Sequence, residues 1–123
     1  MVVAGLADGT VLYDVLKDQM NPLGVKYPVI YDFLNCLGIS PCWGWCNSDP
    51  VARYGTTARA EELNQVYREL IANYTFQNFD ILYMDIPQDE IFARAESMGF
   101  SKRDCIEPVD GFHPSGLANY LMA

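Results

Sequence analysis

Two runs of apolar residues in the chain show no alternation of polar and apolar positions. The first covers residues 2–6 (VVAGL) and ends at the turn residues of 7–9, and the second is the mostly apolar segment 79–85 (FDILYMD). Short apolar runs bounded by turn residues are typical of strands that are buried on both faces of a parallel sheet. We therefore predict two buried strands, one near the start of the sequence and one beyond its middle.

Between and after these runs, apolar residues recur three and four positions apart, which is the spacing of one face of a helix. The clearest case is residues 57–74, whose predicted apolar face consists of Leu63, Val66, Tyr67, Leu70, Ile71 and Tyr74. We expect this face to pack against another part of the protein. Shorter helices are predicted over residues 10–20, 28–37 and 88–98. A last helix is predicted to begin at Pro114, since proline is favoured at the first helical position.

Strands that alternate with helices indicate an α/β fold with a parallel sheet and right-handed connections. The 123 residues amount to one domain at most, and no repeat or linker divides them. Only two strands are convincing, beside one short extended stretch at 106–109, whereas such sheets usually have about four to six strands. We therefore expect part of a domain, with unpaired strand edges that make the isolated chain poorly soluble.

The net charge of −8 and the eight scattered basic residues argue against binding to the nucleic-acid backbone, which requires clustered Lys and Arg. The same charge repels anionic lipid unless a basic patch or a divalent cation intervenes. The sequence shows neither a signal peptide nor a run approaching the roughly 20 apolar residues of a transmembrane segment.

Four cysteines, at positions 36, 42, 46 and 105, favour a disulfide-bonded secreted or lumenal protein, although a reduced protein can also hold four thiols. A zinc site is disfavoured because paired C-x-x-C units are absent. The sequence does not reveal which cysteines pair. One glycosylation tripeptide, Asn73-Tyr74-Thr75, lies at the end of the predicted long helix.

His113 is the only histidine, and it follows Asp110 by three residues in a predicted loop. That spacing lets a carboxylate reach the imidazole, fix its tautomer and stabilise its charged form. An isolated D-x-x-H pair is more often a surface aspartate and an unrelated histidine, so the surrounding residues decide between the two interpretations.

The surrounding residues resemble the SGNH (GDSL-like) hydrolases, and within them the acyloxyacyl hydrolase family. The segments that carry the resemblance span nearly the whole chain, in the order 5–9 (GLADG), 33–37 (FLNCL), 40–45 (SPCWGW), 78–85 (NFDILYMD) and 106–114 (IEPVDGFHP). The resemblance implies the C-terminal portion of a flavodoxin-like three-layer α/β/α fold, so that residues 1–123 form part of one SGNH hydrolase domain.

By this resemblance His113 is the general base that activates a serine, and Asp110 orients it. The family's Gly-Asp-Ser nucleophile and its oxyanion-hole glycine and asparagine would lie before Met1. None of the five serines, which are Ser40, Ser48, Ser97, Ser101 and Ser115, has a comparable setting. We therefore expect the chain alone to be inactive, with no cofactor of its own.

The resemblance also implies a secreted or lysosomal location, a disulfide-linked saposin-like subunit, and calcium bound in the preceding part of the full-length protein. The substrate it implies is an acyl-ester lipid, such as the secondary fatty acyl chains of lipid A in lipopolysaccharide. Trp43, Trp45 and Phe112 are candidates for an acyl-chain pocket, although such aromatic residues more often only pack. Asp8, Asp85 and Glu107 are candidate ligand contacts, although solvated loop carboxylates are commoner.

Two interpretations from different classes remain open. In the first, the chain supplies the Asp–His half of an ester hydrolase whose serine lies elsewhere. In the second, it is a truncated, non-catalytic paralogue that acts as a binding or interaction module. An upstream reading frame that encodes a Gly-Asp-Ser block would favour the first, and an in-frame stop before any such block would favour the second.

Overall fold

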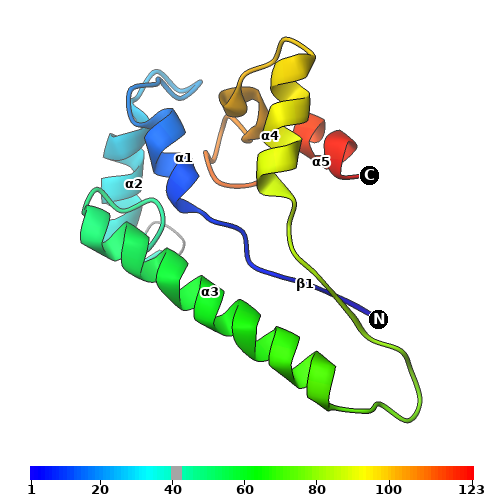
Figure 1. Cartoon of the computed structure of the whole chain (residues 1–123). Helices are drawn as coiled ribbons and strands as arrows, with labels where there is room; N and C mark the ends of the chain where they lie inside the picture. Colours follow the sequence, from blue (N-terminus) through cyan, green and yellow to red (C-terminus); the bar gives the residue numbers. More distant parts are fainter. Residues whose placement is uncertain (40–42) are drawn as a thin grey trace.

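The computed structural model describes residues 1–39 and 43–123 and combines helices with a small parallel sheet (Figure 1). This combination is compatible with the predicted α/β fold. In chain order the elements are β1 (Val2–Ala4), α1 (Thr10–Leu16), α2 (Tyr27–Cys36), α3 (Pro50–Asn73), β2 (Leu82–Met84), α4 (Gln88–Ser97), the 3-10 helix η1 (Lys102–Cys105) and α5 (Gly116–Met122).

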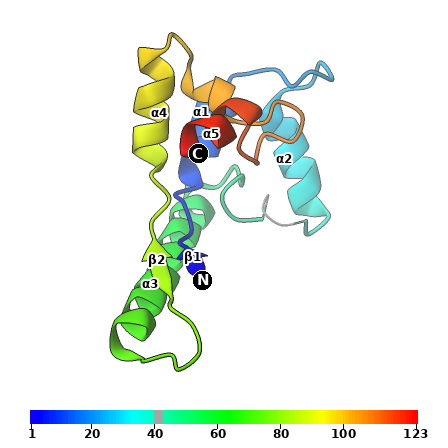
Figure 2. The ribbon, with the colours of Figure 1, turned by 90° about the vertical axis from the view of Figure 1, so that its right-hand side faces the viewer.

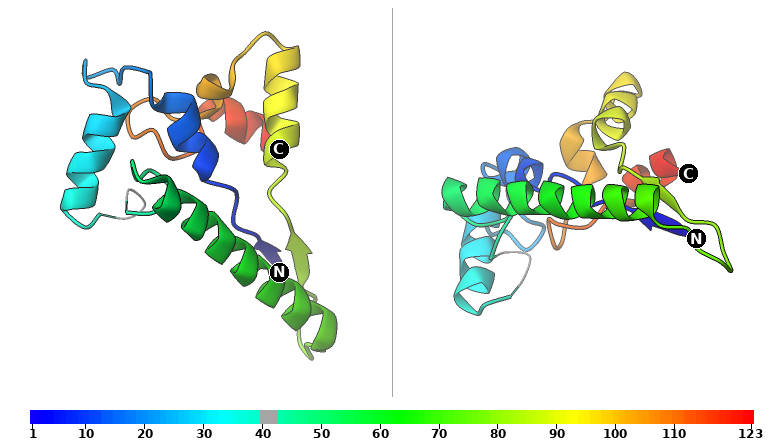
Figure 3. Two further views of the ribbon diagram at one scale, coloured as in Figure 1. Left: turned by 60° about the vertical axis from the view of Figure 1, so that its left-hand side comes forward. Right: turned by 60° about the horizontal axis from the view of Figure 1, so that its bottom comes forward.

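The strands β1 and β2 pair in parallel, with Val2 opposite Leu82 and Ala4 opposite Met84. Figure 2 shows the pair beside α3, and Figure 3 shows the long helix running past both strands. A reciprocal pair of hydrogen bonds ties α3 to the segment after β1: Asn64 Nδ2 donates to Leu6 O at 2.9 Å, and Leu6 N donates to Asn64 Oδ1 at 2.8 Å. These bonds satisfy the amide of Asn64, which is buried.

One face of this sheet is open, which contradicts the predicted burial of the strands on both faces. Tyr83 faces α3, where Arg68 lies over its ring. The alternate positions point the other way, and Val2 and Leu82 remain 59% and 66% exposed. The prediction of buried strands is therefore wrong for the described residues, because none of their helices covers this second face.

Helix α3 is longer than predicted, and its apolar stripe is mostly exposed. It begins at Pro50 because Asp49 caps it, the carboxylate accepting from Val51 N at 2.9 Å. The predicted packing of its stripe is not found among the described residues, where five members are exposed: Leu63, Val66, Tyr67, Leu70 and Tyr74. Both α3 and the sheet thus present apolar surface that a single-domain core would cover.

The predicted start of the last helix is wrong by two residues. Ser115 is the N-cap, and its Oγ accepts from Ala118 N at 3.3 Å. Pro114 instead pairs with Ile106 in an isolated antiparallel bridge. This bridge closes the loop that carries Asp110 and His113.

The core lies beyond the ends of the strands and not on the sheet. One cluster joins α1 and α2 through Leu16, Tyr27 and Tyr31, and a second joins α4, η1 and α5. None of the described helices is long and apolar enough to cross a membrane.

We expect Leu16→Ala to destabilise the chain by about 2–5 kcal/mol, because it leaves a cavity between α1 and α2. Leu16 is 1% exposed, whereas Leu23 is 76% exposed in the following turn. The matched Leu23→Ala change should alter the free energy of unfolding by less than about 0.5 kcal/mol. Urea denaturation of both variants measures the difference, and equal effects would contradict the assigned core.

Candidate active site

Asp110 and His113 form a direct pair on the loop between η1 and α5. Asp110 Oδ2 lies 2.8 Å from His113 Nδ1, and its Oδ1 accepts from the backbone N–H groups of Phe112 at 2.8 Å and His113 at 3.1 Å. With Asp110 ionised, Nδ1 carries the proton of a neutral ring, and Nε2 then has the lone pair of a base. The structure therefore brings the two predicted residues together.

Three side chains from α2 and the turn before it donate hydrogen bonds to backbone carbonyls of this loop. Asn21 Nδ2 donates to Val109 O at 2.6 Å, Tyr27 Oη to Pro108 O at 2.6 Å, and Tyr31 Oη to Gly111 O at 2.8 Å. All three donors are buried, so the bonds satisfy polar groups that would otherwise be costly to bury. The sequence patterns did not reveal these residues, because Asn21 and Tyr27 lie between two predicted helices and Tyr31 is only one position within the second of them.

Gly111 lets the loop sit close to these tyrosines. Its φ of +66° lies in the left-handed region, and a Cβ there would come within 2.5 Å of Tyr31 Oη and 2.8 Å of the Tyr27 ring. A glycine is therefore required both by backbone conformation and by space.

His113 lines a mainly apolar cleft of about 390 Å³ beyond the carboxyl ends of β1 and β2. Open α/β sheets commonly bind ligands at this edge. The polar side chains at the cleft are His113, Asp8 and Gln88, and the apolar ones include Leu12, Ile91 and Phe92. The cleft can thus hold an apolar group beside an imidazole.

Hydrogen bonds occupy the carboxylates of Asp8 and Asp85. Asp8 Oδ1 accepts from Thr10 Oγ1 at 2.6 Å and from Thr57 Oγ1 at 2.8 Å, while Asp85 pairs with Arg68 at 2.6 Å. Burial raises the pKa of the Asp8 carboxyl, but the bonds from Thr10 and Thr57 outweigh it and lower that pKa overall. Among the described residues no group of three or more His, Cys, Asp or Glu side chains could hold a metal ion.

Trp45 joins this network to the loop of His113. Its Nε1 donates to Thr57 Oγ1 at 3.0 Å, and its ring stacks on Phe112 with centroids 6.5 Å apart. Phe112 meets the His113 ring edge-on at 5.1 Å. Trp45 and Phe112 therefore pack, as the commoner interpretation of such residues predicts, and they also line the cleft.

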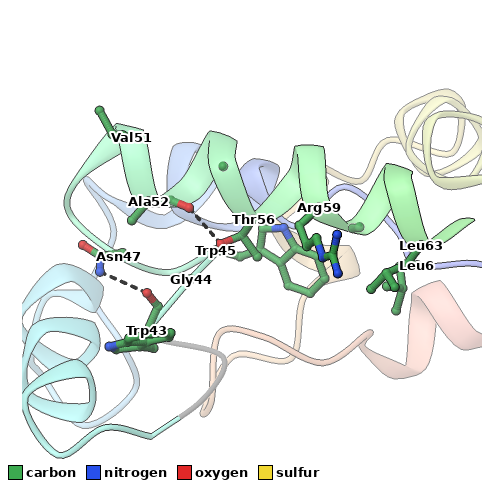
Figure 4. A pocket seen from close by; sticks show the side chains of 12 residues that line it. Leu6, Trp43, Gly44, Trp45, Asn47, Val51, Ala52, Thr56, Arg59 and Leu63 are labelled. Carbon is green, nitrogen blue, oxygen red and sulfur yellow. Dashed lines mark hydrogen bonds between the residues drawn. The ribbon is translucent and has the colours of Figure 1, made fainter.

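A second apolar groove of about 670 Å³ follows the N-terminal half of α3 (Figure 4). Trp43 lies at one end, and Leu63 lies near the other end beside Leu6. Trp45 and Leu6 line both hollows, so the groove lies next to the cleft of His113.

The Asp110 carboxylate suits the role of an orienting group. Partial burial raises the pKa of Asp110, but hydrogen bonds from the His113 ring and from the backbone of Phe112 and His113 outweigh burial and lower it overall. Asp110 is therefore ionised at neutral pH and can stabilise an imidazolium.

No described serine lines the cleft with His113. Ser97 donates to Arg94 O, Ser101 to Asp104 Oδ2, and Ser115 to Asp104 O. Ser48 lies before α3 outside the cleft, and Ser40 lies outside the described residues.

Among the described residues, neither Cys36, which is exposed, nor Cys105, which is buried in η1, forms a disulfide. Cys105 packs in the cluster that joins α4, η1 and α5, and burial raises the pKa of its thiol, which disfavours the thiolate. Cys42 lies outside the described residues, so the predicted disulfides stay a prediction.

An oriented Asp–His pair at the carboxyl edge of a parallel sheet, beside an apolar cleft, is typical of hydrolases with α/β architecture. Comparison with known proteins gives the particular family. The chain is 41% identical over 128 residues to acyloxyacyl hydrolase of Homo sapiens, 39% to that of Mus musculus and 38% to that of Oryctolagus cuniculus.

These alignments cover all of the chain and 22% of the length of each relative. The chain thus belongs to the acyloxyacyl hydrolase family and is homologous over its whole length to the C-terminal part of these relatives, which confirms the resemblance indicated by the sequence motifs. No protein-family model matches the chain.

We expect Gly111→Ala to destabilise the chain more than Gly38→Ala. Both glycines have positive φ, at +66° and +69°, but a Cβ at Gly38 would meet no atom within 4 Å, whereas a Cβ at Gly111 would meet Tyr27 and Tyr31. The backbone alone costs about 1–2 kcal/mol, and the clash adds about 1–3 kcal/mol at Gly111 only. Urea denaturation checks this order, and equal losses would contradict the close packing of the loop.

The lowered pKa of Asp110 predicts a specific dependence of stability on pH. Its contribution is fully present above the unfolded-state value of about 3.9 and is lost as pH falls through the lower folded-state pKa. The difference in unfolding free energy between the natural chain and Asp110→Asn should therefore shrink below about pH 4. Urea denaturation from pH 7 to pH 2 tests this, with Asp18→Asn as the surface control, and a difference that grows on acidification would contradict it.

Proposed function

We propose that this chain is part of a serine ester hydrolase related to acyloxyacyl hydrolase and that it supplies the Asp–His half of the catalytic triad. The observation that carries the proposal is the 2.8 Å contact between Asp110 Oδ2 and His113 Nδ1, in a loop that opens onto the apolar cleft. Its support is the homology of the whole chain to proteins named acyloxyacyl hydrolase.

In this reaction His113 Nε2 removes the proton of a serine hydroxyl as the serine oxygen attacks the ester carbonyl. The resulting imidazolium is stabilised by Asp110, and it then protonates the alkoxide that leaves as the carbonyl bond re-forms. Water attacks the acyl-enzyme by the same proton transfers, which releases a fatty acid and regenerates the serine.

The serine and the oxyanion donors would come from outside the present sequence. No described serine shares the cleft with His113, and the chain corresponds to only 22% of the length of its relatives. We propose that the remaining part carries the Gly-Asp-Ser block and completes a three-layer SGNH fold. The uncovered sheet face at Val2 and Leu82 and the exposed stripe of α3 are the surfaces it would cover.

The substrate we propose is an acyloxyacyl ester such as those of lipid A. The apolar cleft and the groove along α3 suit fatty acyl chains. The net charge of −8 repels the negative phosphate groups of such a lipid. The phosphorylated part of the lipid would therefore bind outside this chain. Calcium, a saposin-like subunit and a secreted or lysosomal location are expected of the complete protein.

The coding sequence upstream of Met1 is the first measurement, and we expect a continuous frame that encodes a Gly-Asp-Ser block. The longer protein should then release fatty acid from lipid A, and His113→Ala or Asp110→Asn should lower kcat by about 10⁴-fold. Asp18→Asn makes the same chemical change at an exposed position outside the cleft and should have no effect.

Full activity after His113→Ala would sink the proposed role. An in-frame stop before any serine block would favour the non-catalytic binding module. The 123-residue chain alone should neither cleave the lipid nor react with a fluorophosphonate serine probe, and labelling of one of its own serines would contradict a nucleophile from elsewhere.

A further inference from the structure

Glu107 is bonded to the loop of the Asp–His pair at four points. Its Oε2 accepts from Val109 N at 2.8 Å and from Asp110 N at 2.9 Å. Its backbone N–H donates to His113 O at 2.8 Å, and its carbonyl accepts from Gly111 N at 2.9 Å. Glu107 therefore holds the backbone of four loop residues directly.

The two backbone bonds could be made by almost any residue at position 107, but the two side-chain bonds require an acceptor of this reach. They matter because Glu107 Oε2 is the acceptor for the N–H groups of Val109 and Asp110, whereas the buried donors bind carbonyl oxygens of the loop. Glu107 therefore restrains the N–H groups of the loop, and Asn21, Tyr27 and Tyr31 restrain its carbonyls.

The position of the Asp110 carboxylate follows from the conformation of this loop. Both of its oxygens bond only within the loop, to the backbone of Phe112 and His113 and to the His113 ring. The pair is also open to solvent, with His113 69% and Asp110 44% exposed at the side chain. Packing alone therefore does not fix the carboxylate, and the backbone of residues 109–110 must be fixed by other bonds.

We propose that Glu107 is a positioning residue that fixes the Asp110–His113 pair through the backbone of Val109 and Asp110, and so sets the tautomer of His113. This inference rests on the proposed function for its catalytic meaning. Glu107 touches neither the imidazole nor any reacting atom. The ionisable group of Tyr27 interacts electrostatically with Glu107, Asp110 and Arg103.

The test uses His113 as its own reporter, because it is the only histidine of the chain. The ¹⁵N label is confined to residues 1–123 within the longer protein, and at pH 8 the ring nitrogen shifts should show the Nδ1–H tautomer. Glu107→Ala should shift the population toward the Nε2–H tautomer, because Asp110 loses its fixed position. Glu107→Gln keeps an acceptor oxygen and should retain the Nδ1–H tautomer.

Glu90→Gln removes the same charge from an exposed position on α4 and should leave the ring shifts unchanged. Circular dichroism establishes that each variant is folded. The proposal is overturned if folded Glu107→Ala keeps the natural tautomer, if folded Glu107→Gln loses it, or if the natural chain lacks it. A purely structural role would lower stability without changing the tautomer.

A measurement on the natural chain covers the case in which Glu107→Ala does not fold. The amide proton of Val109 should change its chemical shift in step with the titration of the Glu107 carboxyl carbon, because that carboxylate is its acceptor. An amide shift independent of this titration would overturn the proposal.

None of these readouts needs a serine, so the two proposals can fail separately. If the tautomer depends on Glu107 but the longer protein does not cleave lipid, the positioning role is supported and the proposed hydrolase function is contradicted. If lipid cleavage depends on His113 but the tautomer does not depend on Glu107, the hydrolase function is supported and the positioning role is contradicted.

Discussion

The hydrogen bonds that three buried side chains donate to the carbonyls of residues 108–111 are the interactions on which the site depends. Tyr27 and Tyr31 project these donors from α2, and Asn21 adds two from the turn before it. The loop at 107–113 has no regular secondary structure, so its polar groups need partners from elsewhere. These partners, together with the bonds from Glu107, turn a local D-x-x-H segment into a defined pair.

The same region connects the site to the rest of the fold. The tyrosines belong to the cluster that joins α1 and α2, and Trp45 stacks on Phe112 while it donates to Thr57 of α3. Asp8, in the loop that follows β1, binds the same threonine. The strand end, the long helix and the histidine loop therefore meet around one cleft, which is where an α/β sheet places its chemistry.

The open surfaces have a common physical origin. A parallel strand with α3 on only one side leaves alternate side chains in water, and a long helix beside two strands cannot bury its whole apolar stripe. Val2, Leu82 and Val66 are exposed for this reason, although their sequence patterns are those of buried residues. The proposed function explains both these surfaces and the absence of a described serine from the cleft, because the chain would then be part of a larger hydrolase domain.

The sequence by itself determined the features that depend on neighbouring residues. Three such features are the spacing of apolar residues along α3, Gly99 with its φ of +86° just after α4, and the contact between Asp110 and His113. Each depends on residues close together in the chain, so the pattern of residue types predicts it. Tertiary structure alone decided that α5 begins at Gly116, after the N-cap Ser115, and not at Pro114, because Pro114 pairs with Ile106. It also decided which residues hold the site: the donor Asn21 is 88 positions from Val109, and Tyr31 is 80 from Gly111. Contacts over such separations depend on how the helices pack, and no local spacing of residues encodes them.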